Sequence, residues 1–375
     1  MKKIKENRGI TLVALVITIV ILLILAGLSI STLTNTGLFK KAKEAKEKTQ
    51  NTEKEQNKIL DEYETALNQY DEKTLVYKVN SGIIKIGNYV SYTPDQANTD
   101  KILEELKKYS GSDANTTSTL RQEELKWRVL DVKDGKVRLI SATPTNQDEI
   151  NAQNKIYLSG AKGYNNAVYL LDKTCKTLYD NSKLASNVQN LKIEDIQEHL
   201  KYDYTQYENT NVDTKKYGGT KEYTTNKNFP NIFAKEKIGW VDGIQGMELN
   251  LSEQDRPINE TKSIANEKIK ITNTYWRKSM VVGDFEKEKY YELFINNGNN
   301  YNIYWISSRC IDAHSDIAYF DVRLVVSGGI NGYYLYNSNN DELSLNYAFR
   351  PVITLNSNVK VTSGEGSENT PFNIE

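Results

Sequence analysis

Residues 5–15 read KENRGITLVAL, and this stretch opens the most distinctive part of the chain. A basic leader precedes Gly9, and residues 10–30 then carry no charge at all. At a rise of about 1.5 Å per residue, about twenty helical residues cross a hydrocarbon core of about 30 Å. The cations in front of the apolar run predict a cytoplasmic N-terminus, with everything after residue 35 delivered outside the membrane.

Two other kinds of N-terminal segment share some of these features. A cleaved secretory signal has an apolar core of about 7–15 residues followed by a small-residue cleavage site. The apolar run in this chain is longer, and a continued helical pattern follows it in place of a clear cleavage site. The interpretation as a plain signal anchor remains open.

The residues around Gly9 resemble the prepilin motif of type IV pilins and related pseudopilins. The residues that carry the resemblance are Arg8, Gly9, Ile10, Thr11, Leu12, Ala14 and Leu15. In that family, a membrane aspartyl peptidase cuts after the glycine and methylates the new N-terminus. The resemblance implies cleavage between Gly9 and Ile10, N-methylation of Ile10, and contacts with other pilin subunits through the N-terminal helix.

One position departs from the family pattern. The family usually has Glu at the fifth mature position, where this chain has Ala14. A glutamate is costly inside a membrane, and in the family it is thought to meet the free amine of a neighbouring subunit. Its absence argues against the abundant shaft subunit and suits a minor or tip subunit, or a lineage that assembles without this ion pair.

Composition limits the other function classes. The 375 residues have a formal net charge of −1, and no basic patch with interleaved aromatic residues indicates nucleic-acid binding. About 300 residues follow the stem, which is enough for one large or two modest domains. The 25 tyrosines offer amphipathic contact surface, although AT-rich coding and ordinary packing explain them equally well. No C-terminal hydrophobic tail or wall-sorting motif is visible, so we expect the N-terminal helix to be the anchor.

The two cysteines, Cys175 and Cys310, allow two interpretations. Outside the cytoplasm they could form one disulfide that closes a long loop, worth about 3–5 kcal/mol in the chain-entropy model. They could equally be two buried thiols. No CxxC pair or His/Cys zinc spacing occurs.

Periodicity predicts an α+β protein with a long N-terminal helix and a strand-rich head. We expect a leader at 1–9, a membrane helix at 10–34, an amphipathic stem at 35–72 and an extracellular head at 73–375. The stem carries a thin apolar stripe that strengthens toward Tyr63 and Tyr70, as in a helix packed partly on the head. Asn35-Thr36-Gly37 is the expected kink.

Within the head, the pattern predicts short helices and several strands. The clearest hairpin runs from Lys126 to Ile140 around the turn Asp134-Gly135. Residues 202–235 have little periodicity and predict a long loop or flap. Predicted helices cover 101–109, 164–179 and 193–200, and predicted strands cover 83–86, 89–92, 268–271, 304–308, 318–326, 332–336, 350–355 and 359–362.

A second, weaker resemblance covers about residues 80–360. The segments 127–130, 304–310 and 349–352 are similar to patterns in bacterial surface domains related to C-type lectins and formylglycine-generating enzymes. That resemblance implies a few helices packed on an irregular twisted sheet, with long loops that form a binding face.

The residues that could act as metal ligands or nucleophiles do not form an active-site pattern in the sequence. We therefore do not expect an enzyme or a cofactor. Asp312, His314 and Asp316 could offer metal ligands, and residues 337–342 could hold calcium, although a loop and a polar turn fit these stretches better. Ser307 and Ser308 lie near His314 in sequence but lack a nucleophile elbow.

Charged residues of the head have structural interpretations. His199 ends a predicted helix, where a surface histidine suits the helix dipole. The best-placed buried cations are Arg309, Arg323 and Arg350, for which pairing with Asp321 or Asp312 is the first hypothesis.

The sequence therefore predicts a type IV pilin-like subunit of a surface pilus or pseudopilus in a Gram-positive cell envelope. Its expected partners are the membrane, the prepilin peptidase and other pilin subunits. The alternative is a membrane-anchored surface adhesin or ligand-binding protein that does not assemble into a fibre. A third class, a lectin-fold enzyme, would require a bound metal or an oxidised cysteine pair at a pocket.

Overall fold

The computed structural model describes residues 38–113, 120–145, 154–204, 217–230, 251–259, 263–296, 303–313, 316–326 and 328–375. It divides into two compact units, of which the first ends at Glu64 and the second, the head, runs from Thr65 to Glu375. Helices and strand-rich mixed sheets occur together in the described part, so the predicted α+β class is confirmed. The predicted leader, membrane helix and kink lie outside the described residues.

The predicted stem is one continuous helix, α2 (Leu38–Asn68). It contains no Gly or Pro, and its many Lys, Glu and Gln residues have high helix propensity. Its last turn belongs to the head unit, where Thr65 is buried and Asn68 Nδ2 donates to Ser357 Oγ at 3.1 Å. Tyr70, which we expected to pack on the head, is 83% exposed, because the helix ends at Asn68 and a turn follows.

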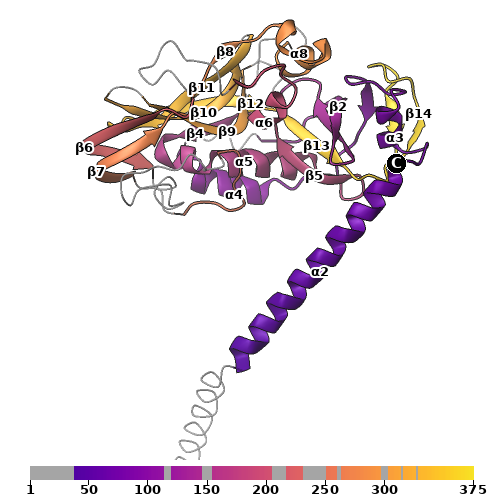
Figure 1. Ribbon diagram of the computed structural model, residues 1–375, viewed down its shortest axis with the longest axis horizontal. Coiled ribbons are helices and arrows are strands. Elements are labelled where there is room, and N and C mark those ends of the chain that lie inside the picture. Colours follow the sequence, from indigo (N-terminus) through magenta and orange to yellow (C-terminus); the bar gives the residue numbers. More distant parts are fainter. Residues whose placement is uncertain are drawn as a thin grey trace, which may run out of the picture. The chain divides into compact units, whose positions relative to one another are not determined.

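A seven-stranded sheet forms one part of the head (Figure 1). Its order is β14-β15-β1-β2-β3-β13-β5, so the last strand of the chain pairs with the first. Only β1 and β15 run parallel, and all other neighbours in this sheet are antiparallel. The strands are β1 (Tyr89–Ser91), β2 (Trp127–Lys133), β3 (Lys136–Ser141), β5 (Ala185–Asn190), β13 (Pro351–Leu355), β14 (Val361–Ser363) and β15 (Phe372–Ile374).

The predicted hairpin is strands β2 and β3 of this sheet. Asp134 and Gly135 have φ angles of 49° and 71°, as a two-residue type I′ turn requires. That turn fixes the register, in which Lys133 lies opposite Lys136. The predicted hairpin is therefore confirmed together with its turn.

A six-stranded sheet has the order β4-β12-β9-β10-β11-β8, and a separate two-stranded ribbon joins β6 to β7. Figure 1 shows the β6–β7 ribbon at one end of the head. The central strand β9 is buried along its whole length. The strands are β4 (Ile156–Ser159), β6 (Thr220–Pro230), β7 (Ser263–Thr272), β8 (Lys278–Ser279), β9 (Tyr304–Ala313), β10 (Ala318–Val326), β11 (Gly329–Asn337) and β12 (Ser344–Phe349).

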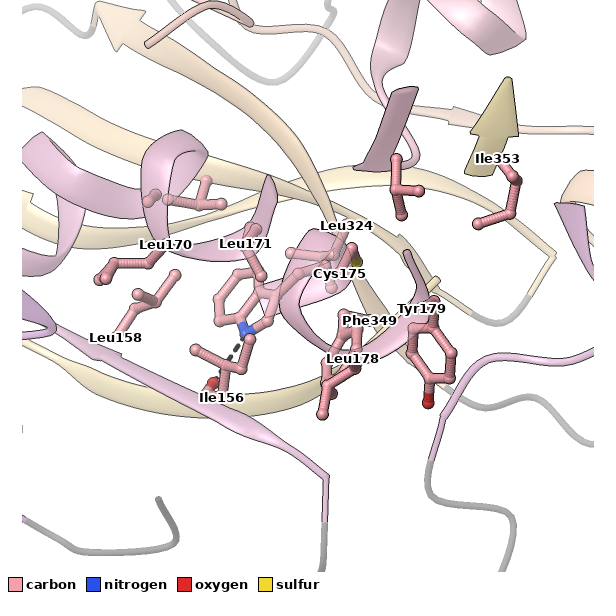
Figure 2. Close-up of a cluster of buried hydrophobic side chains, with 14 of the residues drawn as sticks. Ile156, Leu158, Leu170, Leu171, Cys175, Leu178, Tyr179, Leu324, Phe349 and Ile353 are labelled. Carbon is pink, nitrogen blue, oxygen red and sulfur yellow. Dashed lines mark hydrogen bonds between the residues drawn. The ribbon is translucent and has the colours of Figure 1, made fainter. Parts of the chain in front are cut away.

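The longest described helix of the head, α5, forms the centre of the hydrophobic core. Leu171, Cys175 and Leu178 of α5 are fully buried, and Figure 2 shows them among side chains from the strands. The Trp305 indole donates to the Ile156 carbonyl oxygen at 3.0 Å, which joins β9 to β4 across the core. The helices of the head after α2 are α3 (Leu75–Asn80), α4 (Asp100–Tyr109), α5 (Gly160–Tyr179), α6 (Ile193–Gln197), η4 (Val282–Asp284) and α8 (Glu288–Phe294).

The secondary structure predicted for two segments of the head is wrong. Residues 83–86 do not form a strand, because Gly82 and Gly87 on either side have φ angles of 76° and 86° and turn the chain. Within 202–235, which we predicted as a loop, residues 220–230 form β6. A register shift between Thr224 and Lys227 interrupts the alternation that would have marked this strand in the sequence.

The half-buried carboxyl of Asp172 on α5 gives the head a testable pH dependence. Burial raises the pKa of Asp172 to about 6, against the opposing effect of Lys192, whose ammonium lies 3.4 Å away. A folded-state pKa above the unfolded value of about 3.9 means that this group stabilises the fold below pH 4. That stability is lost as the pH rises through 6.

We therefore expect Asp172→Asn to become more stable relative to wild type as the pH rises from 4 to 7.5. The expected relative gain is about 2–3 kcal/mol, since each pKa unit corresponds to about 1.4 kcal/mol. Denaturation of both proteins over this pH range measures the difference between their free energies of unfolding. The other carboxyl groups affect both proteins equally, so their contribution cancels in this difference. Parallel stability curves for the two proteins would contradict the assignment.

Candidate functional site

The predicted processing site lies outside the described residues, and so does the rest of its motif. These positions are Arg8, Gly9, Ile10, Thr11, Leu12, Ala14 and Leu15. Among the helices in the described part of the chain, none has the length and apolar character needed to cross a membrane. The predicted membrane run at 10–34 lies outside the described residues.

Apolar side chains are exposed along the C-terminal half of α2. Ile59, Leu60, Tyr63 and Leu67 are each more than half exposed. Ile59, Tyr63 and Leu67 follow one another at four-residue steps, so they share one side of the helix. The described residues thus leave this apolar stripe exposed to solvent.

Cys175 and Cys310 are both buried free thiols, so the disulfide alternative is not the one in the structure. Cys175 lies on α5, and Arg309 of β9 reaches toward the same helix, where its guanidinium donates to the Asn165 carbonyl oxygen at 3.2 Å. Side chains alternate along a strand, so Cys310 points to the opposite side of β9. The sheet thus separates the two sulfurs.

Cys310 sits in a polar environment on that side of the sheet. A Cβ on Gly332 would lie 3.0 Å from the Cys310 sulfur and 2.8 Å from the Asp321 carboxylate, so both contact the glycine. Burial raises the pKa of both groups well above their usual values. A thiol in this state is not a nucleophile.

The metal candidates are not brought together in the described residues. Asp312 and Asp316 lie in the described part of the chain, and His314 lies outside it. Among the described residues, no three His, Cys, Asp or Glu side chains come together as a metal site. In the calcium candidate, Asn337 accepts from the backbone N–H groups of Asn339 and Asp341 at 2.9 and 3.1 Å. These hydrogen bonds to the Asn337 side chain close the segment into a polar turn.

The three predicted buried arginines are buried, and backbone carbonyl groups hold Arg323 and Arg350 in place of the predicted carboxylates. Arg323 donates to the carbonyl oxygens of Trp276 and Thr274, and Arg350 donates to those of Ser141 and Ala142. Within the described residues, no carboxylate lies at ion-pair distance from Arg323 or Arg350. Pairing with Asp321 or Asp312 is therefore wrong for Arg323 and Arg350, and burial raises the pKa of the Asp321 carboxyl well above its usual value.

Among the described residues, a buried network of charged side chains surrounds Arg138 on β3. Its guanidinium binds both carboxylate oxygens of Asp131 on β2 and one oxygen of Asp195 on α6. All three residues are at most 6% exposed. Such bidentate contacts to a planar guanidinium are strong and directional, and they fix α6 against the hairpin.

His199, which follows α6, completes this network. Its Nε2 lies 2.8 Å from Asp131 Oδ2, and its ring stacks on Tyr290 of α8 at 3.8 Å between centroids. The prediction of a surface histidine is thus wrong, because α8 covers one face of the ring. Burial alone would raise the pKa of Asp131, but hydrogen bonds from Arg138 and His199 outweigh it and hold the pKa below its usual value.

A cleft of about 660 Å³ opens beside Asp131 and His199, in the size range of small-ligand sites. Charged residues of both signs line it, and these are Lys85, Lys287, Lys289, Glu198 and Glu286. The described lining residues include no Ser, Thr or Cys, so the Asp131–His199 pair does not form a Ser-, Thr- or Cys-based triad with them. This arrangement can hydrogen-bond a polar ligand.

No known protein family, curated protein or solved structure matches this chain. The resemblances to pilins and to C-type-lectin-like domains therefore stay predictions.

Proposed function

We propose that the chain is a type IV pilin-like protein, a minor or tip subunit of a surface pilus or pseudopilus. The observation that carries the proposal is the segment KENRGITLVAL followed by an uncharged run and then by a helix. In this proposal the peptidase cleaves after Gly9, and residues 10–34 anchor the protein in the membrane before assembly. The head, from Thr65 onward, is exposed outside the cell.

Helix α2 supports this proposal in two ways. It continues without a break from Leu38 to Asn68, which provides a stem between the apolar run and the head. It also exposes the apolar stripe of Ile59, Tyr63 and Leu67, a surface that neighbouring helices in a fibre would cover. Ala14 removes the register-setting glutamate of the family, which favours a minor or tip position over the shaft.

The experiment that tests the proposal is intact mass and N-terminal sequencing of the protein from its native membrane fraction. We expect a chain that begins at methylated Ile10. Gly9→Leu should retain Met1 and remain in the membrane, whereas the control Gly27→Leu, within the apolar run, should be processed normally. An intact N-terminus in wild type, in cells that contain the peptidase, would rule out prepilin processing.

A second candidate is a membrane-anchored ligand-binding protein that forms no fibre. The cleft beside Asp131 and His199 favours it, because a polar cleft of about 660 Å³ serves a binding role with or without assembly. Co-purification separates the two candidates. Recovery of other pilins with the processed chain supports assembly, and their absence supports the anchored binding protein.

A further inference from the structure

A small polar cavity lies beside a bulge between strands β9 and β10 of the six-stranded sheet. The register of the two strands shifts between Val322 and Leu324, so residues 306–308 of β9 lie opposite the single residue Arg323 of β10. A bulge of this kind changes the direction of the side chain at its centre. Arg323 lines a cavity of about 220 Å³, which we call the Arg323 cavity.

The guanidinium of Arg323 is buried among neutral groups. Arg323 is 3% exposed, and it donates to the carbonyl oxygens of Trp276 and Thr274. The neighbouring Asp321 carboxyl does not balance its charge, because burial raises the pKa of Asp321 well above its usual value. A guanidinium carries five N–H donors, so Arg323 retains donors for a further acceptor. A buried cation in such surroundings is stabilised by a bound anion.

A second guanidinium and one carboxylate also belong to the wall of this cavity. Arg309 lines it from β9 and donates to the Asn165 carbonyl oxygen at 3.2 Å. Glu194 of α6 is exposed and accepts from Ser252 Oγ at 2.7 Å, and no ion pair in the described structure joins it to Arg323. Because Glu194 repels negative charge, a singly charged anion fits this wall better than a doubly charged one.

The remaining wall of the Arg323 cavity has apolar surface for the body of a small ligand. Tyr204 and Tyr217 meet there edge to face, with ring centroids 5.5 Å apart, and Ile193 and Leu251 also line the cavity. An apolar cavity of about 150 Å³ admits a benzene ring. A cavity of about 220 Å³ therefore has room for one ring and a carboxylate.

We propose that the Arg323 cavity binds a small monocarboxylate of about the size of benzoate. The planar guanidinium presents parallel N–H groups that match the two oxygens of a carboxylate. The tyrosine rings contact the body of the ligand, and Glu194 disfavours dianions. This site does not depend on processing at Gly9, and it shares no described lining residue with the cleft beside Asp131.

Calorimetric titration of the full chain in detergent micelles tests the proposal. The probe is benzoate, and its matched control is benzamide, a neutral molecule of nearly the same shape. We expect benzoate to bind saturably and about tenfold more tightly than benzamide or more, because hydrogen bonds between charged groups are the stronger ones. Sulfate, a dianion, should bind more weakly than benzoate. Absence of saturable benzoate binding, or equal affinity for benzoate and either benzamide or sulfate, would overturn the proposal.

A gain-of-affinity variant locates the binding in this cavity. Glu194→Gln removes the carboxylate from the wall and should tighten benzoate binding about threefold to tenfold, with benzamide binding unchanged. A damaged fold cannot produce this gain. Glu124→Gln, at an exposed glutamate that does not line the cavity, changes the net charge equally and should leave benzoate binding unchanged. Equal effects of the two variants would assign the change to net charge and overturn the proposal.

A loss-of-affinity variant tests the cation itself. Arg323→Met should weaken benzoate binding about tenfold or more and affect benzamide little, because the charged donor is lost. Circular dichroism shows whether this variant keeps its fold. Unchanged benzoate affinity in folded Arg323→Met would place the ligand elsewhere and contradict the proposal. If Arg323→Met does not fold, the comparison of Glu194→Gln with Glu124→Gln decides.

Discussion

Replacing Arg138 with methionine should lower the free energy of unfolding of the head by about 3–5 kcal/mol. The guanidinium is the cation that Asp131 and Asp195 share, and removal of one partner from a buried ionic network leaves the others uncompensated. Chemical denaturation of the full chain in detergent, followed by tryptophan fluorescence, measures this loss. A loss below about 1 kcal/mol would show that water compensates the two carboxylates.

Two further variants make this result specific. Lys126→Met breaks the exposed pair with Glu368 and should leave stability nearly unchanged. Arg138→Met combined with Asp131→Asn and Asp195→Asn should recover much of the loss, because no buried charge remains. Failure of the triple variant to recover would assign the effect of Arg138 to packing of its aliphatic stem.

The same network predicts the sign of an acid effect. The pKa of Asp131 lies below its usual value, so its contribution is present above pH 4 and is lost as pH falls through the folded-state pKa. The stability difference between wild type and Arg138→Met should therefore shrink in acid. A difference that stays constant to the lowest accessible pH would contradict this.

This network shows what the sequence could have revealed. The Asp134-Gly135 turn was predicted correctly, and a two-residue turn places Asp131 opposite Arg138. Two opposite charges placed directly across the hairpin were thus a readable signal of an ion pair. The sequence could not predict that Asp195 and His199 join this pair, because the short helix α6 meets the hairpin only through tertiary packing.

The Arg323 cavity could not be predicted for a similar reason. Arg309 and Arg323 were predicted correctly as buried cations, but the segments that line the cavity with them meet only through tertiary packing. Strands β12 and β15 were missed, and β15 is the strand beside β1. Local pattern identified β9, β10 and α5, whose apolar faces are wide. It failed for the short strands β12 and β15 and for the longer β6, whose alternation a register shift interrupts.

Arg350 is the site of the second large expected effect. Strand β12 ends at Phe349 in the six-stranded sheet, and β13 begins at Pro351 in the seven-stranded sheet, so Arg350 alone separates them. Its guanidinium donates to the carbonyl oxygens of Ser141 and Ala142 at 3.0 and 3.3 Å.

On the other side of the crossing, Arg350 contacts the six-stranded sheet and the end of α8. It donates to the Tyr304 hydroxyl at 3.3 Å and to the Phe294 carbonyl oxygen at 3.4 Å. The guanidinium also lies over the Tyr304 ring, 5.4 Å from its centroid. One buried cation therefore binds elements of both sheets by donating to neutral acceptors.

We expect Arg350→Met to lower the free energy of unfolding by about 2–5 kcal/mol, since each buried acceptor that loses its donor costs about 1–3 kcal/mol. Arg350→Lys should not restore stability, because an ammonium cannot reproduce the planar fork that reaches several acceptors at once. Arg121→Met, at an exposed arginine, is the matched control and should change little.

The form of the transition tests the role of Arg350 more directly than its midpoint does. If Arg350 couples the two sheets, its loss should split one unfolding transition into two. Two single-tryptophan variants can report the two transitions separately. One retains Trp127 in the seven-stranded sheet, and the other retains Trp305 in the six-stranded sheet. Coincident transitions in Arg350→Met, at lowered stability, would mean that the shared hydrophobic core couples the sheets and that Arg350 only satisfies its local acceptors.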